Sequence, residues 1–275
     1  MSFIRLFSVL AIFLFLSCNN SNEISKPNIV LFMVDDLGWQ DTSVSFWKSE
    51  TKFNKLYNTP NMEILAEMGV KFTDAYATPV CSPSRISLMT GMNAAKHKVT
   101  NWTLHPNQKK PAEINHKSFD FPDWNYNGLS TRDSISNTIY ATPLPQILKD
   151  NGYYTIHAGK AHLGAIGYPS SNPLNIGFDI NIAGHAAGAP QSYLGIDHFG
   201  NNDKSKKIWA VPGLEKYHGK DIFLTQAISE EVLEKLQKPI NSKSPFFLYF
   251  SLYNVHAPLM EDNRFVEKYK NIGLK

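Results

Sequence analysis

The segment from Cys81 to Met92 reads Cys-Ser-Pro-Ser-Arg-Ile-Ser-Leu-Met-Thr-Gly-Met and has one nucleophile-type side chain at its start. Ser82 is a helix-capping residue type, Pro83 suits a first helical turn, and Gly91 suits a left-handed C-terminal cap. The segment is therefore predicted to be a short helix that begins at Cys81. Free N–H groups and partial positive charge at that end favour chemistry on a sulfate or phosphate ester. A cysteine taken alone is more often a small buried residue.

Polar side chains follow three apolar runs that are typical of strands covered on both faces. The runs are Asn28–Val34 before Asp35 and Asp36, Tyr153–Ala158 before Lys160 and His162, and Phe246–Tyr253 before His256. Ligands of open parallel sheets bind at the carboxyl ends of the strands. An acidic pair there suits a hard divalent cation, although a bare pair is about as often a simple turn. A lone lysine is more often a solvated surface charge, but one between glycines after a strand is a site candidate.

Together these segments resemble the type I sulfatases of the alkaline phosphatase superfamily. The resemblance rests on Cys-x-Pro-Ser-Arg with a following Thr-Gly, on the Asp-Asp pair, on Gly-Lys-Ala-His-Leu-Gly from Gly159, and on His-x-Pro at His256. The motifs occur in the family's order and cover Asn28 to Pro258. The resemblance implies an α/β fold with a mostly parallel central sheet and helices on both faces. Ala161 departs from the family, which usually has tryptophan there.

The resemblance also implies a mechanism. In the family a maturing enzyme oxidises the cysteine before folding to formylglycine (3-oxoalanine), whose hydrated form attacks sulfur with one hydroxyl and expels sulfate through the other. Arg85 would hold the hydrated aldehyde, and His256 would protonate the departing alcohol. The implied catalytic residues are Cys81, Arg85, His162 and His256; the implied substrate-binding residues are Lys160, His162 and His256; and the implied calcium ligands are Asp35, Asp36 and Cys81.

The first residues predict export. Residues 1–17 combine Arg5 with an apolar stretch from Leu6 to Leu16 that is shorter than the roughly 20 residues needed to span a bilayer, as in a secretory signal peptide. Phe-Leu-Ser-Cys at Cys18 resembles a bacterial lipoprotein box, which predicts a lipid anchor on Cys18, a tether over residues 18–27, and a location in the periplasm or outer membrane. A plain cleaved signal is the alternative. The chain has 2 cysteines, so modification of both would leave no disulfide.

Composition limits the class of protein. A chain of 275 residues with 19% charged residues is typical of one large globular domain, here expected over residues 28–275. The formal charge of +3, without a basic run that contains aromatic residues, predicts no nucleic-acid partner.

Other segments carry weaker expectations. Helices are expected over Thr59–Gly69, Pro143–Lys149 and Asp221–Gln237, and a further strand over Val70–Ala77. The irregular stretch 93–130 is expected near the site rim, where Trp102, Trp124 and Tyr126 could stack on sugars, although packing is the commoner role. In the loop 172–200, His185 and Gln191 are candidates for substrate selection, but a structural role is favoured and no function is assigned to them.

The leading interpretation is an exported enzyme that removes sulfate from a sulfated carbohydrate. The alternatives are a phosphonate or phosphate monoester hydrolase of the same superfamily, and an inactive glycan-binding envelope lipoprotein. Sulfatases carry a second calcium-binding pair, a second sulfate-binding lysine and a small C-terminal subdomain that find no match here. Asp262-Asn263 comes too soon after His256, and Lys268 and Lys270 are expected to be surface charges. The sequence is therefore expected to be the N-terminal portion of a longer sulfatase, or a truncated copy.

Overall fold

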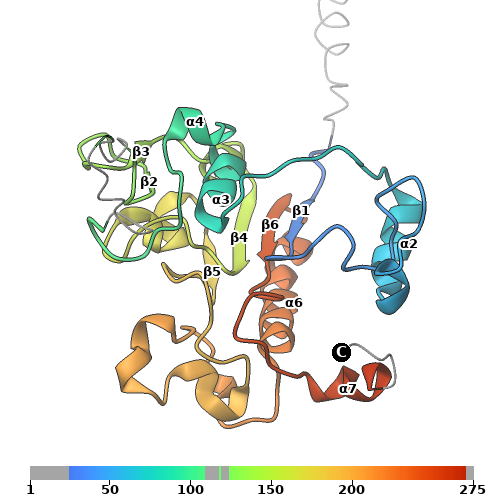
Figure 1. Ribbon diagram of the computed structural model, residues 1–275. Coiled ribbons are helices and arrows are strands. Elements are labelled where there is room, and N and C mark those ends of the chain that lie inside the picture. The colour runs from blue at the N-terminus through green and yellow to red at the C-terminus, as the bar shows by residue number, and fades with distance from the viewer. Residues whose placement is uncertain (1–24, 109–117, 119–123, 271–275) are drawn as a thin grey trace, which may run out of the picture.

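A four-stranded parallel sheet lies at the centre of the molecule (Figure 1). The computed structural model describes residues 25–108, 118 and 124–270. The strands of this sheet are β1 (Ile29–Met33), β4 (Tyr154–Gly159), β5 (Ile180–Ile182) and β6 (Phe246–Ser251), and a separate parallel pair is formed by β2 (Leu129–Ser130) and β3 (Ile139–Tyr140). The order across the central sheet is β1-β6-β4-β5. Of the described strands, the last in the sequence therefore lies between the first and β4.

Helices and shorter helical turns connect these strands. The α-helices are α2 (Pro60–Met68), α3 (Cys81–Thr90), α4 (Ala94–His97), α5 (Leu144–Asp150), α6 (Leu224–Ser242) and α7 (Asn263–Tyr269). The 3-10 turns are η1 (Asn54–Leu56), η2 (Pro169–Ser171), η3 (Pro173–Ile176), η4 (Gly195–Gly200), η5 (Lys204–Trp209) and η6 (Glu215–Tyr217). The structure confirms the three expected strands that are followed by polar residues, and it confirms all four expected helices; the ends of these elements differ from those expected.

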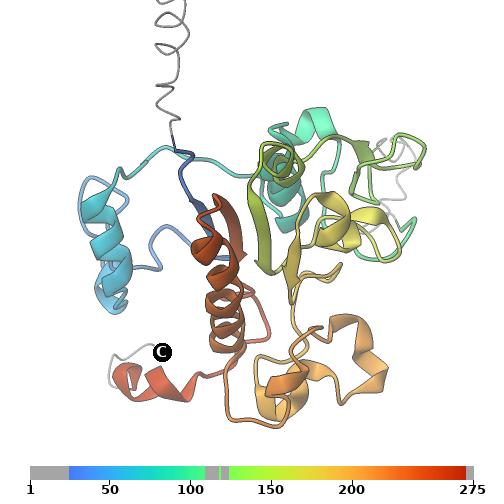
Figure 2. The same cartoon turned by 180° about the vertical axis from the view of Figure 1, so that it is seen from behind.

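The two faces of the sheet are covered by different helices, because alternate side chains of a strand point to opposite faces. From β6, Phe247 and Tyr249 pack into the cluster that contains Ile86 of α3. Leu248 packs instead into the cluster that contains Ile228 of α6. Figure 1 is seen from the side of α3, and Figure 2 from the side of α6. The expected α/β fold, with a parallel sheet and helices on both faces, is thus confirmed.

The edge strand β1 is covered on one face only. Ile29, Leu31 and Met33 pack against the cluster on the α3 side. On the other face Val30 is 57% exposed and Phe32 is 50% exposed, although Phe32 makes an edge-to-face contact with the ring of Phe250. Helix α6 makes its main strand contacts with β4 and β5. Apolar side chains of an edge strand therefore remain on the surface of the described part.

Two details of the sequence interpretation are wrong. Residues 70–77 contain no strand; Val70, Phe72 and Tyr76 are all more than 70% exposed, so the segment has neither a neighbouring strand nor a face to bury. A β-type composition is not sufficient without such a partner. Within the expected helix Asp221–Gln237, Leu233 belongs to the apolar pattern that predicts the buried face, but it is 63% exposed in α6, because the helix turns Ile228 and Val232 toward the sheet.

The predicted leader and Cys18 lie outside the described residues, as does most of the segment 109–123. Among the helices that the structure describes, none combines the length and the apolar character that crossing a bilayer requires.

Candidate active site

Cys81 is the first residue of α3 and is partly exposed, with a free thiol. Val80 precedes it in an extended conformation, and Gly91 ends the helix with φ of 69°. The expected capping by Ser82 is wrong: its hydroxyl accepts a hydrogen bond from the Thr103 backbone N–H at 3.1 Å instead. The first turn therefore keeps its free N–H groups beside the Cys81 side chain, where they can bind an anion.

Arg85 lies one helical turn after Cys81, on the same side of α3. Its side chain is 1% exposed and donates from Nη1 to the Lys160 carbonyl oxygen at 2.7 Å and to the Ser251 hydroxyl at 2.5 Å. Nη2 donates to Asp35 Oδ1 at 2.8 Å. Within the described part of the chain, Arg85 Nε is buried and has no acceptor. Arg85 thus joins the ends of three strands, and its Nε–H remains available to a further oxygen.

Asp35 and Lys160 complete a buried charge cluster with Arg85. Asp35, directly after β1, is 6% exposed, and its Oδ2 accepts from Nζ of the fully buried Lys160. Burial, and after it the charge of Arg85, lowers the pKa of Lys160. Two cations therefore share one carboxylate. One positive charge is left without a partner in this cluster, and a buried cation is stabilised by a bound anion.

The carboxyl ends of β1 and β6 bring Asp36 and His256 to the same place. The Asp35 N–H donates to the Asn254 carbonyl at 2.8 Å, and the Val255 N–H donates to the Asp35 carbonyl at 2.7 Å. As a result His256 Nε2 lies 3.8 Å from Asp36 Oδ2. His256 Nδ1 lies 2.7 Å from the Ala257 carbonyl oxygen. A carbonyl can only accept, so the Nδ1 atom carries the proton and Nε2 faces the site.

A divalent cation fits part of this arrangement. Ligand atoms of Asp35, Asp36 and His256 all lie within 4.8 Å of one another. The carboxylates suit calcium, which takes about six to eight oxygen ligands, whereas an imidazole does not. Two carboxylates do not complete that number. The Cys81 thiol is not in the group, and a soft thiol would be a poor calcium ligand, so the implied ligation by residue 81 requires its conversion to an oxygen function.

His162 is buried and electrically neutral. It is 3% exposed, and its pKa lies well below the usual value because of burial first and then the charges of Lys160 and Arg85. Its Nε2 lies 2.8 Å from the Thr103 carbonyl oxygen and must be the donor. Among the described residues, Nδ1 has no partner. The unpaired ring atom is therefore an acceptor, so a neutral His162 in this orientation has no N–H left to donate to a substrate oxygen.

Several supporting residues gave no signal in the sequence. Ser251 and Tyr249 contact Arg85 from β6, and Thr103 fixes both Ser82 and His162. Their partners lie from 21 to 166 residues away. Only the inward position of Ser251 in an apolar strand could have indicated a polar contact.

The residues suggested for sugar stacking or substrate selection are packed against, or hydrogen-bonded to, other parts of the protein. Trp124 is 3% exposed and lies edge-to-face with Tyr126 at 5.7 Å, so its ring is not open for sugar stacking. Trp102 is partly buried against the cluster that contains Leu104. Burial lowers the pKa of His185 to about 4, and the Gln191 N–H donates to the Trp209 carbonyl at 2.7 Å.

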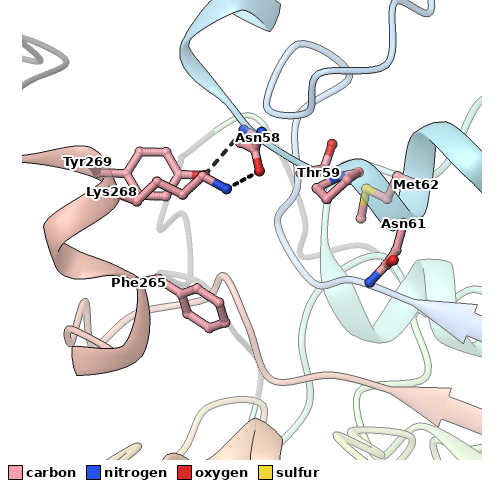
Figure 3. A pocket seen from close by; sticks show the side chains of 8 residues that line it. Asn58, Thr59, Asn61, Met62, Phe265, Lys268 and Tyr269 are labelled. Carbon is pink, nitrogen blue, oxygen red and sulfur yellow. Dashed lines mark hydrogen bonds between the residues drawn. The ribbon is translucent and has the colours of Figure 1, made fainter.

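A groove of about 460 Å³ lies between the start of α2 and α7 (Figure 3). Lys268 donates there to the Asn58 side-chain oxygen, and the Asn58 N–H lies 3.2 Å from the Tyr269 hydroxyl. Lys270 pairs with Glu267, and Asp262 caps α7 through the Arg264 N–H. None of the implied catalytic or metal-binding residues lines this groove, and both lysines are surface charges as expected.

The family model described as Sulfatase matches residues 27–273. The chain belongs to the sulfatase family. This sulfatase is 30% identical over 256 residues to N-acetylgalactosamine-6-sulfatase of Mus musculus, an alignment that covers 87% of the chain and 42% of the relative. It is 27% identical to a protein named "Sulfatase" of Formosa agariphila, with 89% and 47% covered. The chain thus spans less than half the length of these relatives.

Solved structures agree with the fold. The sulfatase superposes on the crystal structure of Ps i-CgsB with a TM-score of 0.63 and 28% identity, over 91% of this chain and 50% of that one. The same protein in complex with k-i-k-neocarrahexaose gives a TM-score of 0.60 and 27% identity, with 90% and 49% covered.

Proposed function

We propose that this sulfatase hydrolyses sulfate esters of carbohydrates at a formylglycine formed from Cys81. The observation that carries the proposal is the charge cluster at the strand ends. Arg85 and Lys160 share the single carboxylate of Asp35, and all three side chains are buried. The remaining positive charge, next to the free N–H groups of α3, would stabilise a sulfate group.

The carbohydrate part of the proposal is supported by relatives. One is named N-acetylgalactosamine-6-sulfatase, and a structural neighbour was crystallised with k-i-k-neocarrahexaose. A sugar alkoxide is a poor leaving group, so such a substrate needs a proton donor near the bridging oxygen. His256 offers Nε2 toward the site and is oriented by its Nδ1 hydrogen bond. His256 is therefore the proposed general acid, a role in which both ring nitrogens carry a proton and Nε2 gives its proton to the leaving oxygen.

Other side chains would assist the modified residue. A hydrated aldehyde at position 81 supplies one hydroxyl for attack on sulfur and a second hydroxyl through which sulfate is released. Arg85 Nε, which has no acceptor among the described residues, would hold an oxygen of residue 81. Neutral His162 would serve only as a hydrogen-bond acceptor through its unpaired Nδ1, because its lowered pKa makes it a weak base. Lys160 would neutralise charge on the sulfate oxygens.

Calcium is the proposed metal, held by Asp35 and Asp36 with an oxygen of the converted residue 81. It would supply positive charge beside the sulfate. We further propose an exported lipoprotein, on the basis of residues 1–18, whose partners would be a formylglycine-generating enzyme and, through Cys18, a membrane.

The experiment combines modification and turnover. The chain is expressed with a formylglycine-generating enzyme, and the peptide that contains Cys81 is analysed by mass spectrometry. Rates with an aryl sulfate, an aryl phosphate and a panel of sulfated saccharides are then compared with those of Cys81→Ala. An aldehyde at position 81 with turnover of sulfates alone is expected. A preference for phosphate would instead indicate a phosphomonoesterase, and an unmodified thiol without turnover would favour a glycan-binding protein.

A further inference from the structure

The turn that carries His256 is held by a hydroxyl from a distant segment. Tyr193 Oη lies 2.8 Å from the Tyr253 carbonyl oxygen and 2.7 Å from the His256 carbonyl oxygen. Both atoms are acceptors, so the Tyr193 hydroxyl is the donor and its one hydrogen is shared between them. The His256 N–H also donates to the Tyr253 carbonyl, at 3.1 Å. The Tyr253 carbonyl, the His256 carbonyl and the His256 N–H are therefore held together by the Tyr193 hydroxyl and the hydrogen bond within the turn.

Tyr193 is itself fixed in place. It is 1% exposed, and its ring stacks on Phe223 with 5.3 Å between the ring centres and 7° between the planes. Its N–H approaches Met260 Sδ at 3.3 Å, and its carbonyl accepts from the Leu224 N–H at 2.7 Å. Tyr193 thus has little freedom to move, and its hydroxyl transmits that rigidity to the turn.

The His256 carbonyl belongs to the same peptide unit as the Ala257 N atom, and the Ala257 carbonyl orients the imidazole through Nδ1. If the His256 carbonyl changed its orientation, the Ala257 carbonyl would rotate with the backbone and the Nε2 atom of His256 would move. We propose that Tyr193 is a positioning residue for His256, whose hydroxyl keeps the imidazole aimed at the leaving oxygen. This inference rests on the proposed function of His256, but the tether can be tested without turnover.

The variant Tyr193→Phe removes the hydroxyl and keeps the stacked ring. Tyr253→Phe is a matched control, because Tyr253 is also 1% exposed and also donates to one carbonyl, that of Ala183, at 2.8 Å. Both variants lose one buried hydrogen bond, but only Tyr193→Phe loses the bond to the His256 carbonyl; Tyr253→Phe loses the bond that joins the start of the turn to Ala183. A general loss of stability would affect them alike.

Turnover is measured with a sugar sulfate and with an aryl sulfate whose phenolate leaves without protonation. General acid catalysis contributes about 100-fold to 10,000-fold, so a displaced imidazole should lower kcat for the sugar ester by about 10-fold or more. The aryl ester should change by less than about 3-fold with Tyr193→Phe, and Tyr253→Phe should not separate the two substrates. Equal losses on both esters with Tyr193→Phe would overturn the proposal.

Amide hydrogen exchange gives the measurement that does not need activity. Loss of a hydrogen bond worth about 0.5–1.5 kcal/mol should speed exchange of a peptide spanning residues 252–260 by about 2-fold to 12-fold in Tyr193→Phe. Tyr253→Phe keeps the Tyr193 bond to the His256 carbonyl, so it should speed exchange of that peptide less than Tyr193→Phe does. Unchanged exchange in Tyr193→Phe would refute the tether whatever the turnover, whereas faster exchange in a chain that hydrolyses no sulfate would refute only the proposed function.

Discussion

Removing the charge of Asp35 is predicted to destabilise this sulfatase more than removing its partner Lys160. The cluster contains two cations and one anion, since Arg85 and Lys160 both pair with Asp35. Asp35→Asn would leave two buried cations without a carboxylate, and breaking such a buried pair costs about 3–5 kcal/mol. Lys160→Met would leave the 2.8 Å pair between Asp35 and Arg85 and would lose one charge-assisted hydrogen bond, about 1.5–3 kcal/mol.

The assay is urea unfolding followed by circular dichroism, with both single variants and the double variant. The double variant should be less destabilised than the sum of the singles, because loss of Lys160 relieves repulsion between the two unpaired cations. Sulfate should stabilise Asp35→Asn more than Lys160→Met at equal ionic strength, and the second variant serves as the control for general salt effects. Equal costs for the two singles, together with strict additivity, would refute the charge argument.

Three other outcomes follow from the structure. Burial lowers the pKa of His157 to about 3, so the folded chain binds fewer protons at this residue than the unfolded chain. The free energy of unfolding should therefore fall as the pH is lowered from 6.5 to 3, by about 2 kcal/mol at pH 5. In His157→Gln, the urea midpoint should depend less on pH in that window. Calcium should raise the melting temperature of the native chain and a chelator should reverse it, whereas Asp36→Asn should show neither shift. Light scattering of the double variant Val30→Thr and Phe32→Thr should show less self-association than the native chain at equal stability.

The site was predictable wherever local pattern and strand ends coincide. Asp35, Lys160 and His256 each follow an apolar strand, and parallel strands bring such positions to one edge of the sheet. The contacts between Asp35 and Lys160 and between Asp36 and His256 confirm this arrangement. The helix that begins at Cys81 was predictable from its proline and its terminal glycine.

The rest depended on contacts that no local pattern contains. The bond from Arg85 to Ser251 and the bonds from Tyr193 to the His256 turn link segments separated by 166 and by 60 to 63 residues. The Thr103 carbonyl, in an irregular segment, likewise determines which ring nitrogen of His162 is left without a partner among the described residues, because it accepts from Nε2. Residues 70–77 show the opposite failure, in which local composition predicted a strand that has no neighbour.

The position of β6 in the sheet has a consequence for biosynthesis. Because β6 is made after β1 and β4 and inserts between them, the contact between Arg85 and Ser251 cannot form until the ribosome has added about 170 residues after Cys81. At about 5–20 residues per second, that delay is roughly 10 to 30 s. An oxidising enzyme that acts on the nascent chain would have this interval to reach the thiol, so strand order would set the time available for the proposed maturation.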